Sequence, residues 1–208
     1  MDISVTEKIE ANINVEGALT VPAHTLYDIV RKLPDGSEVL LEGDVNETGK
    51  LQIKSANCNF SLACLPTTDF PNVEFENEVN RFKLPASEII SLLEKTKFAI
   101  SVEETRYFLN GIFLHSAEFE GEELLSTVAT DGHRLAKLAV ALPEGAANLT
   151  GVIIPRKTVY EVIKLLEQTD SEVEIAVSDT KICFNFGNST LISKLIDGNF
   201  PDYQNVIP

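Results

Sequence analysis

Two stretches of the 208-residue chain share one pattern, "VPAHTLYDIVRKLPDGSEV" at residues 21–39 and "IPRKTVYEVIKLLEQTDSEV" at residues 154–173. Each has an aliphatic residue and a proline ahead of a Thr-aliphatic-Tyr-acid-aliphatic-aliphatic run. Each continues into strand-like residues and closes on a Phe-Pro segment, "DFPNV" in the first copy and "FPDYQNV" in the second. The match keeps its order over roughly 50 residues at a spacing of about 130. The pattern therefore predicts two copies of one structural unit.

The two copies differ in what precedes them. From Arg81 the second copy has a further helix-like segment and several strand-like segments ahead of the shared pattern, whereas only residues 1–20 precede the first copy. When the strand-like segments of the two copies are aligned in sequence, Met1 of the first copy corresponds to a position near Gly132 of the second. We therefore expect residues 1–74 to be the back part of a first domain whose front is missing. Residues 75–208 are expected to be a complete second domain of a longer repeat protein.

Hydrophobic periodicity predicts the elements of one unit. Apolar residues at helical spacing, each time with a proline expected at the first helical position, predict helices over residues 22–33, 85–99 and 155–168. Period-2 alternation between turn signals predicts strands within residues 107–116, 124–131, 134–142, 171–179, 181–187 and 189–196. Each unit should thus hold two helices against an antiparallel sheet of about eight strands, which is an α+β fold.

Composition narrows the class of protein. Hydrophobic residues make up 44% of the chain, enough for a packed core, and no apolar run approaches the ~20 residues of a membrane span. The acidic N-terminus lacks the apolar region of a signal peptide. The chain has an odd number of cysteines at irregular spacings, and each lies in an apolar, strand-like run: Cys58, Cys64 and Cys183. They are expected to be buried thiols in a reducing cytoplasm, rather than a disulfide or zinc site.

The charge distribution leaves two interpretations open. A net charge of −15 argues against nucleic acid as a partner, because phosphate binding depends on Lys and Arg. However, the three expected helices carry seven basic and five acidic residues, a net +2, which leaves −17 for the rest of the chain. The helices could simply have solvated faces with bases near their C-termini. Alternatively, they form a surface that meets a polyanion through loose backbone contacts while the rest of the molecule repels it.

The stretch "TVATDGHRL" at residues 127–135 concentrates polar residues that are common in catalytic sites. A catalytic interpretation would make His133 and Asp131 an acid–base pair. The other two histidines, at 24 and 115, have no metal-ligand spacing, and the sequence contains no GxSxG, CxxC, HExxH or Gly-rich phosphate loop. Catalysis therefore has little support.

Two other interpretations of this stretch remain. Thr130 and Asp131 ahead of Gly132 are typical of a tight turn, because Asp bonds back to the backbone and Gly supplies a positive φ. The stretch could be that turn alone. It could also be a recognition site, in which the strand leaving the turn sets Arg134 and Leu135 beside an apolar depression.

The combination of "TVATDGHRLA" with "RYFLNG", "VIIPRKTVYEVIKLL" and "DGNFPDY" resembles the bacterial DNA polymerase III β subunit, the sliding clamp. "VPAHTLYDIVRKLPDG" and "CLPTTDFPN" resemble the first domain of the same family. The resemblance covers nearly the whole chain in the right order, and the combination of motifs is highly specific. It implies a clamp fold with three similar domains per chain, two chains closing into a ring, helices inside and sheets outside.

The resemblance also implies a function. Such a protein is a processivity factor of the bacterial cytoplasm, without catalysis or cofactor, that encircles double-stranded DNA regardless of its sequence and tethers the polymerase. The DNA polymerase III α subunit, the clamp loader and other partners would dock through short peptides of the QLxLF type. The full protein would be a homodimeric ring with no membrane role. A chain without the front of domain one and without domain three is not expected to close a ring. A protein-interaction module without DNA encirclement remains the alternative.

The family motifs assign two sets of residues in this chain. The peptide pocket, formed in the family between domains two and three, would here use Leu109, Thr130, Gly132, His133, Arg134, Leu135, Pro201 and Val206. Its affinity should be reduced where domain three is missing. The residues implied near DNA are His24, Tyr107, Phe108, Arg156 and Lys157, with His24 standing where the family often has a base.

Overall fold

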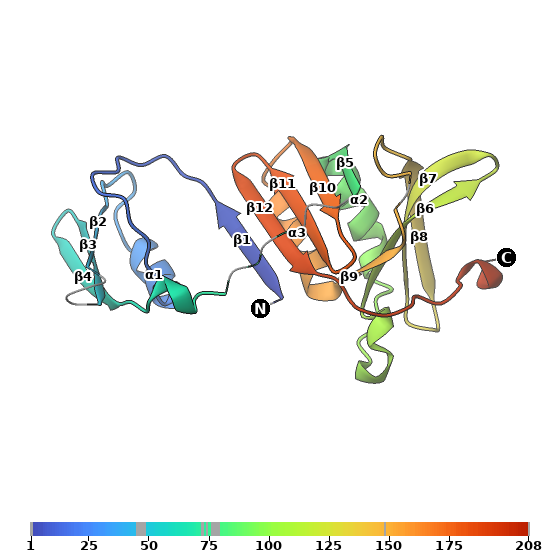
Figure 1. The fold of residues 1–208 in the computed structure, drawn as a ribbon, viewed down its shortest axis with the longest axis horizontal. Coiled ribbons are helices and arrows are strands. Elements are labelled where there is room, and N and C mark those ends of the chain that lie inside the picture. The colour runs from blue at the N-terminus through green and yellow to red at the C-terminus, as the bar shows by residue number, and fades with distance from the viewer. Residues whose placement is uncertain are drawn as a thin grey trace. The chain divides into compact units, whose positions relative to one another are not determined.

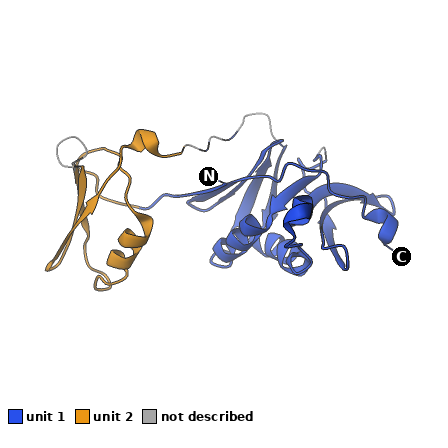
Figure 2. Ribbon diagram, turned by 90° about the horizontal axis from the view of Figure 1, so that it is seen from below, with its two compact units in different colours: residues 1–9, 73–208 blue, residues 10–72 orange. Residues whose placement is uncertain are grey.

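The structure, a computed structural model, describes residues 2–44, 49–71, 73, 75, 80–147 and 149–207. The chain divides into a larger unit, residues 1–9 with 73–208, and a smaller unit, residues 10–72 (Figure 2). The first nine residues thus pack with the larger unit, although the sequence groups them with the smaller one. The expected domain boundary falls at Glu74, which lies outside the described residues. Each unit is described below by itself.

The smaller unit is one helix on a three-stranded antiparallel sheet. The helix is α1 (Ala23–Val30), and the sheet has the order β2 (Leu40–Asp44), β3 (Lys50–Ser55), β4 (Cys58–Ala63). A short 3₁₀ turn follows at Thr67–Asp69. The buried core of the smaller unit consists of Leu51, Ile53 and Leu62, with partly buried residues such as Leu26 and Ile29 of α1 packed against it.

The first sheet of the larger unit joins strands from both ends of the chain. Its order is β1 (Ile3–Glu7), β12 (Ser189–Lys194), β11 (Lys181–Phe186), β10 (Glu172–Val177) and β5 (Asn80–Pro85) (Figure 1). β1 pairs antiparallel with β12, so that Ile3 lies opposite Ser193 and Glu7 opposite Ser189. The N-terminal strand therefore covers the edge that β12 would otherwise expose.

The second sheet of the larger unit has the order β8 (Leu135–Ala141), β7 (Glu122–Thr130), β6 (Gly111–Phe119) and β9 (Val152–Pro155). Helices α2 (Ala86–Lys97) and α3 (Arg156–Leu166) pack against each other, α2 also against β7 and β8, and α3 against β6 and β9. One buried apolar cluster runs through both helices and both sheets. Two helices with strands β5 to β12 confirm the predicted α+β class for the larger unit, but these strands lie in two sheets and not in the single sheet expected.

The helix starts differ from the prediction by one residue. Pro22, Pro85 and Pro155 are N-cap residues with φ of −63°, −58° and −58° and extended ψ of 110°, 141° and 144°, so each helix begins at the next residue. Proline fixes φ near −65° in strand and helix alike, and here ψ keeps it extended. In the larger unit β5 and β9 end at Pro85 and Pro155, so each strand passes directly into its helix.

Three other predictions are wrong. The expected strand over 107–116 begins only at Gly111, because Glu104–Leu109 form a 3₁₀ turn. Strands β5 and β9 were not expected, since each is short and lies directly before a proline. Cys58 is exposed rather than buried, whereas Cys64 is half-buried and Cys183 is buried. Cys58 begins β4 directly after the turn that joins β3 to β4, which explains its exposure.

Candidate functional site

The turn between β7 and β8 is held closed by its own side chains. Thr130 and Leu135 face each other across the end of the two strands. The Thr130 hydroxyl donates to the carbonyl of Arg134 at 2.7 Å and accepts from the amide of Gly132 at 3.1 Å. Gly132 has a φ of +89°, the left-handed conformation that glycine adopts without strain. The tight-turn interpretation of this stretch therefore describes its local structure.

Asp131 serves this turn as a hydrogen-bond acceptor. Its carboxylate accepts from the amides of His133 at 2.9 Å and Arg134 at 3.1 Å, and from Arg134 Nε at 2.9 Å. The backbone hydrogen bond from His133, with those from Arg134, lowers the pKa of Asp131 to about 2. A carboxylate held this way is a poor proton acceptor at neutral pH, so the geometry does not favour an acid–base role for Asp131.

Two arginines, Arg134 within the turn and Arg106 outside it, lie between the turn and the segment after α2. The Arg134 guanidinium lies 5.7 Å from the centre of the Phe98 ring, just beyond the end of α2. Arg106, in the 3₁₀ turn, forms an ion pair with Glu103 at 2.7 Å. A Cβ added to Gly132 would lie only 2.7 Å from Arg106 Nη1. The turn is therefore packed against the segment that joins α2 to β6.

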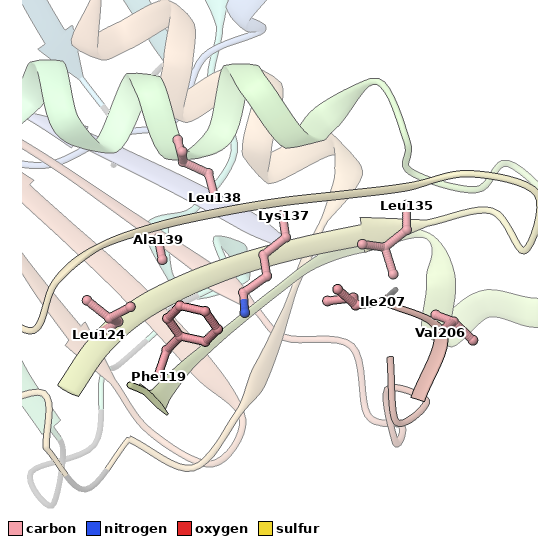
Figure 3. Close-up of a pocket in the computed structure, with 8 residues that line it drawn as sticks. All are labelled: Phe119, Leu124, Leu135, Lys137, Leu138, Ala139, Val206 and Ile207. Carbon is pink, nitrogen blue, oxygen red and sulfur yellow. The ribbon is translucent and has the colours of Figure 1, made fainter. Parts of the chain in front are cut away.

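An apolar groove of about 590 Å³ begins beside this turn and follows β8 (Figure 3). It is lined by Phe119, Leu124, Leu135, Lys137, Leu138, Ala139, Val206 and Ile207. Figure 3 shows Leu135 of β8 directed toward Val206 and Ile207, which come from the last described residues of the chain. The Lys137 ammonium lies 5.8 Å from the Phe119 ring centre. We call this feature the β8 groove.

The residues assigned to the pocket from the sequence fall into three groups. Leu135 and Val206 line the β8 groove. Thr130, Gly132, His133 and Arg134 form the turn from which β8 starts. Leu109 is buried and Pro201 is exposed, and neither lines the groove. The role of all eight in ligand binding stays a prediction.

Sequence reasoning missed most of the groove lining. Lys137 and Ala139 follow Leu135 at period 2 along β8, so the alternation of that strand could have identified them. Phe119 and Leu124 lie on neighbouring strands near the far end of the groove, and Ile207 adjoins Val206 in the C-terminal segment. No local pattern signals these three, because the chain fold alone brings them to β8.

A basic surface lies on the helices of the larger unit. Arg156 and Lys157 open α3 and are exposed. Lys97 of α2 and Arg156 of α3 lie 5.1 and 5.6 Å from the centre of the Tyr160 ring. Lys97 also pairs with Glu94. Arg156 and Lys157 are thus exposed cations at the start of α3, whereas Lys97 is half-buried and ion-paired.

The other three residues expected near DNA from the sequence lie outside these helices of the larger unit. Tyr107 and Phe108 sit in the 3₁₀ turn with ring centres 5.8 Å apart, edge to face, and Tyr107 is 53% exposed. Gly198 lies against them, since a Cβ added there would be 3.0 Å from the Phe108 Cβ. His24 is exposed in the first turn of α1, in the smaller unit. The structure thus places four of the five in the larger unit.

Within the described part of the chain, no three His, Cys, Asp or Glu residues come together in a way that could hold a metal ion. Among the helices described, none has the length and apolar character needed to cross a membrane.

Comparison with known proteins identifies the family. Residues 83–202, more than half of the chain, match the model of the DNA polymerase III beta subunit, central domain. The chain belongs to the DNA polymerase III β subunit family. Residues 1–74 match the model of the N-terminal domain of the same subunit.

Relatives within the β subunit family match this chain along its whole length. The beta sliding clamp of Caulobacter vibrioides is 46% identical over 208 residues, which are 56% of its own length. A DnaN sliding clamp from Bartonella birtlesii, solved bound to griselimycin, has a TM-score of 0.93 and 51% identity, with 55% of that chain covered. The DNA polymerase sliding clamp of Caulobacter crescentus has a TM-score of 0.94 and 46% identity over 55% of that chain. The present chain thus spans about half the length of the relatives it matches.

Proposed function

We propose that this chain is part of a DNA polymerase processivity factor, a ring-shaped sliding clamp that surrounds duplex DNA and tethers the replicative polymerase. The observation that carries the proposal is the β8 groove, which starts at the ATDGHRL turn that marks the family. The role is non-catalytic and belongs to the bacterial cytoplasm.

The β8 groove suits a short apolar peptide. Its wall is aliphatic and aromatic apart from Lys137, and Val206 and Ile207 on its open side are 70% and 43% exposed. Aliphatic pockets with a few polar groups at the rim bind extended peptides by burying two or three anchor side chains. The ligand-bound sliding clamp of B. birtlesii supports ligand binding in this family. The partners would be the polymerase III α subunit, the clamp loader and other proteins with a clamp-binding peptide.

The basic helix surface suits DNA. Arg156, Lys157 and Lys97 are point charges on helices, without side chains arranged to read base edges. Such contacts bind phosphates without regard to sequence and let the duplex slide. His24, Tyr107 and Phe108 would add contacts from the smaller unit and the 3₁₀ turn.

The domain assignment is part of this proposal. Residues 1–74 would be the back part of the first clamp domain and residues 75–208 the second domain, in keeping with the two family models that match. The relatives are nearly twice as long as this chain, which supports a third domain beyond the second. Two such complete chains would form the ring.

Calorimetry with a QLxLF-type pentapeptide tests the groove. We expect heat of binding with the unaltered chain and at least a ten-fold weaker affinity for Val206→Glu, because a carboxylate would be placed in the apolar wall. Val102→Glu is the matched control, since Val102 is equally exposed at 70% and lies outside the groove lining. Absence of heat with the unaltered chain would remove the docking role.

Retention on circular DNA tests encirclement. A protein that carries these residues together with the remaining length of its relatives should stay on nicked circular DNA and leave it when the circle is cut. Arg156→Glu with Lys157→Glu should lower the salt dependence of loading by roughly one unit of slope per lost phosphate contact. Equal release from circles and linear DNA would favour the alternative, a protein-interaction module that does not surround DNA.

A further inference from the structure

The open wall of the β8 groove is formed by a segment that has no regular secondary structure until its end. After β12 the chain runs through residues 195–203 and ends in a short 3₁₀ turn at Gln204–Val206. Asp202 caps this turn by accepting from the Gln204 amide at 3.2 Å and from Asn205 Nδ2 at 2.8 Å. The position of Val206 and Ile207 therefore depends on what holds this tail to the sheet.

A row of four rings joins the tail to β6. Phe200 stacks on Phe113 with ring centres 4.8 Å apart and planes 1° apart. Phe113 stacks on His115, two residues along the same face of β6, at 4.7 Å and 24°. His115 then meets Tyr203 of the tail at 5.6 Å. The two outer rings belong to the tail and the two inner rings to the sheet, so the tail is fixed at two points.

Hydrogen bonds in this row set the protonation of His115. Its Nδ1 lies 2.8 Å from the Ser116 carbonyl, which can only accept, so Nδ1 carries the proton. In the neutral ring Nε2 is then an acceptor, and the Tyr203 hydroxyl donates to it at 2.9 Å. His115 and Tyr203 are buried, at 8% and 5% exposure. Protonation of Nε2 would reverse this bond, because Nε2–H would then donate to the Tyr203 oxygen and the hydroxyl hydrogen of Tyr203 would lose its acceptor.

The surroundings oppose a charged imidazole. Burial lowers the pKa of His115, and the positive charge of Lys137 from β8 lowers it further against the opposing hydrogen bond to Ser116. The Lys137 ammonium lies 5.5 Å from the Tyr203 ring centre. Burial raises the pKa of Tyr203, so its hydroxyl keeps its proton. On β7 the residue opposite His115 is Ser126, which carries no charge.

We propose that His115 and Tyr203 form a latch that positions the tail as the wall of the β8 groove, and that the latch weakens when the imidazole of His115 is protonated. His115 and Tyr203 are positioning residues, since neither lines the groove. Acidification would place a second cation beside Lys137 and remove the acceptor that Tyr203 uses. Val206 and Ile207 would then lose their fixed place opposite Leu135. This inference rests on the proposed peptide-binding function of the groove.

Peptide affinity measured as a function of pH tests the latch. As the pH falls from 7.5 to below the lowered pKa of His115, the unaltered chain should lose about three- to ten-fold in affinity for the pentapeptide, the range of one such hydrogen bond. Tyr203→Phe should show a similar loss already at pH 7.5, and His115→Gln, which cannot be protonated, should show no pH step. His133→Gln controls for the histidine of the adjoining turn and should keep the step.

Amide hydrogen exchange of residues 204–207 gives a readout without peptide. After correction for the intrinsic rate, exchange should rise about three- to ten-fold once the pH is below the lowered pKa of His115 in the unaltered chain, and not in His115→Gln. If the peptide fails to bind but exchange rises in the unaltered chain and not in His115→Gln, the proposed function is refuted and the latch is supported. If exchange and affinity are the same in Tyr203→Phe as in the unaltered chain, the latch is refuted.

Discussion

The same sequence pattern folds into two differently packed copies. In the larger unit, α3 buries Thr158, Val159, Val162, Ile163 and Leu166, whereas in the smaller unit no residue of α1 is buried. Ile163 is 4% exposed and its counterpart Val30 is 50% exposed. The helix itself forms in both copies. The comparison shows that the local pattern specifies the element, while its burial depends on residues distant in the chain.

The difference lies in what the helix packs against. α3 contacts α2, β6 and β9, which precede it in the larger unit. In the described part of the smaller unit, α1 has only the three-stranded sheet β2–β3–β4 and its core of three buried residues. Phe70, the counterpart of Phe200, is 60% exposed, whereas Phe200 stacks on Phe113 of β6. The smaller unit should therefore be the less stable of the two.

The largest expected effect comes from a matched pair of leucines. Leu166→Ala should destabilise the larger unit by about 2–5 kcal/mol, because Leu166 is fully buried and its loss leaves a cavity. Leu33→Ala, at the equivalent position and half-buried, should cost the smaller unit about 1 kcal/mol. Hydrogen exchange with mass spectrometry, read on peptides from each unit, separates the two values. Equal losses would show that α1 is packed as tightly as α3.

An intermediate effect is expected from the two phenylalanines. Phe200→Ala should destabilise the larger unit by about 1–2 kcal/mol, since it removes a stacked ring pair and part of a half-buried side chain. Phe70→Ala should change the smaller unit by less than about 0.5 kcal/mol, because that ring is exposed. Urea denaturation of the two variants checks both values. A larger loss for Phe70→Ala would reverse the comparison.

The smallest effect concerns the two Asp-Gly turns, at Asp131 and Asp35. The pKa of Asp131 is lowered to about 2 in the folded chain. Its contribution to stability should therefore be complete above its unfolded value near 4 and be lost as the pH falls toward 2. Asp131→Asn should remove that part of the acid dependence, and Asp35→Asn should leave it unchanged. Acid titration followed by circular dichroism measures this dependence. Identical curves for all three proteins would contradict the role given to Asp131.

Much of the larger unit could be predicted from the sequence, because its elements follow from periodicity. The helices expected at 85–99 and 155–168 occur at Ala86–Lys97 and Arg156–Leu166. The expected strand at 134–142 is β8, and its first residue, Leu135, lines the groove. The short strands β5 and β9 were missed, since strands of six and four residues that end in a proline carry too little alternation to identify.

The site itself was only partly predictable. The turn motif could be recognised because its polar residues bond within five positions of one another, and it lies where β8 and the groove begin. Phe119 and Ile207 line the groove from positions almost 90 residues apart, and the latch joins His115 to Tyr203 across a separation of 88. Contacts of this kind depend on strand register and on the path of the tail, which no local pattern encodes.

The docking role of the β8 groove is most directly tested by methyl NMR of the chain titrated with the QLxLF-type pentapeptide. The account predicts saturable shifts confined to the methyl groups of the groove lining, which are those of Leu124, Leu135, Leu138, Ala139, Val206 and Ile207, with Leu65 of the smaller unit unmoved. Saturable shifts that gather elsewhere, or no shifts at millimolar ligand, would contradict it.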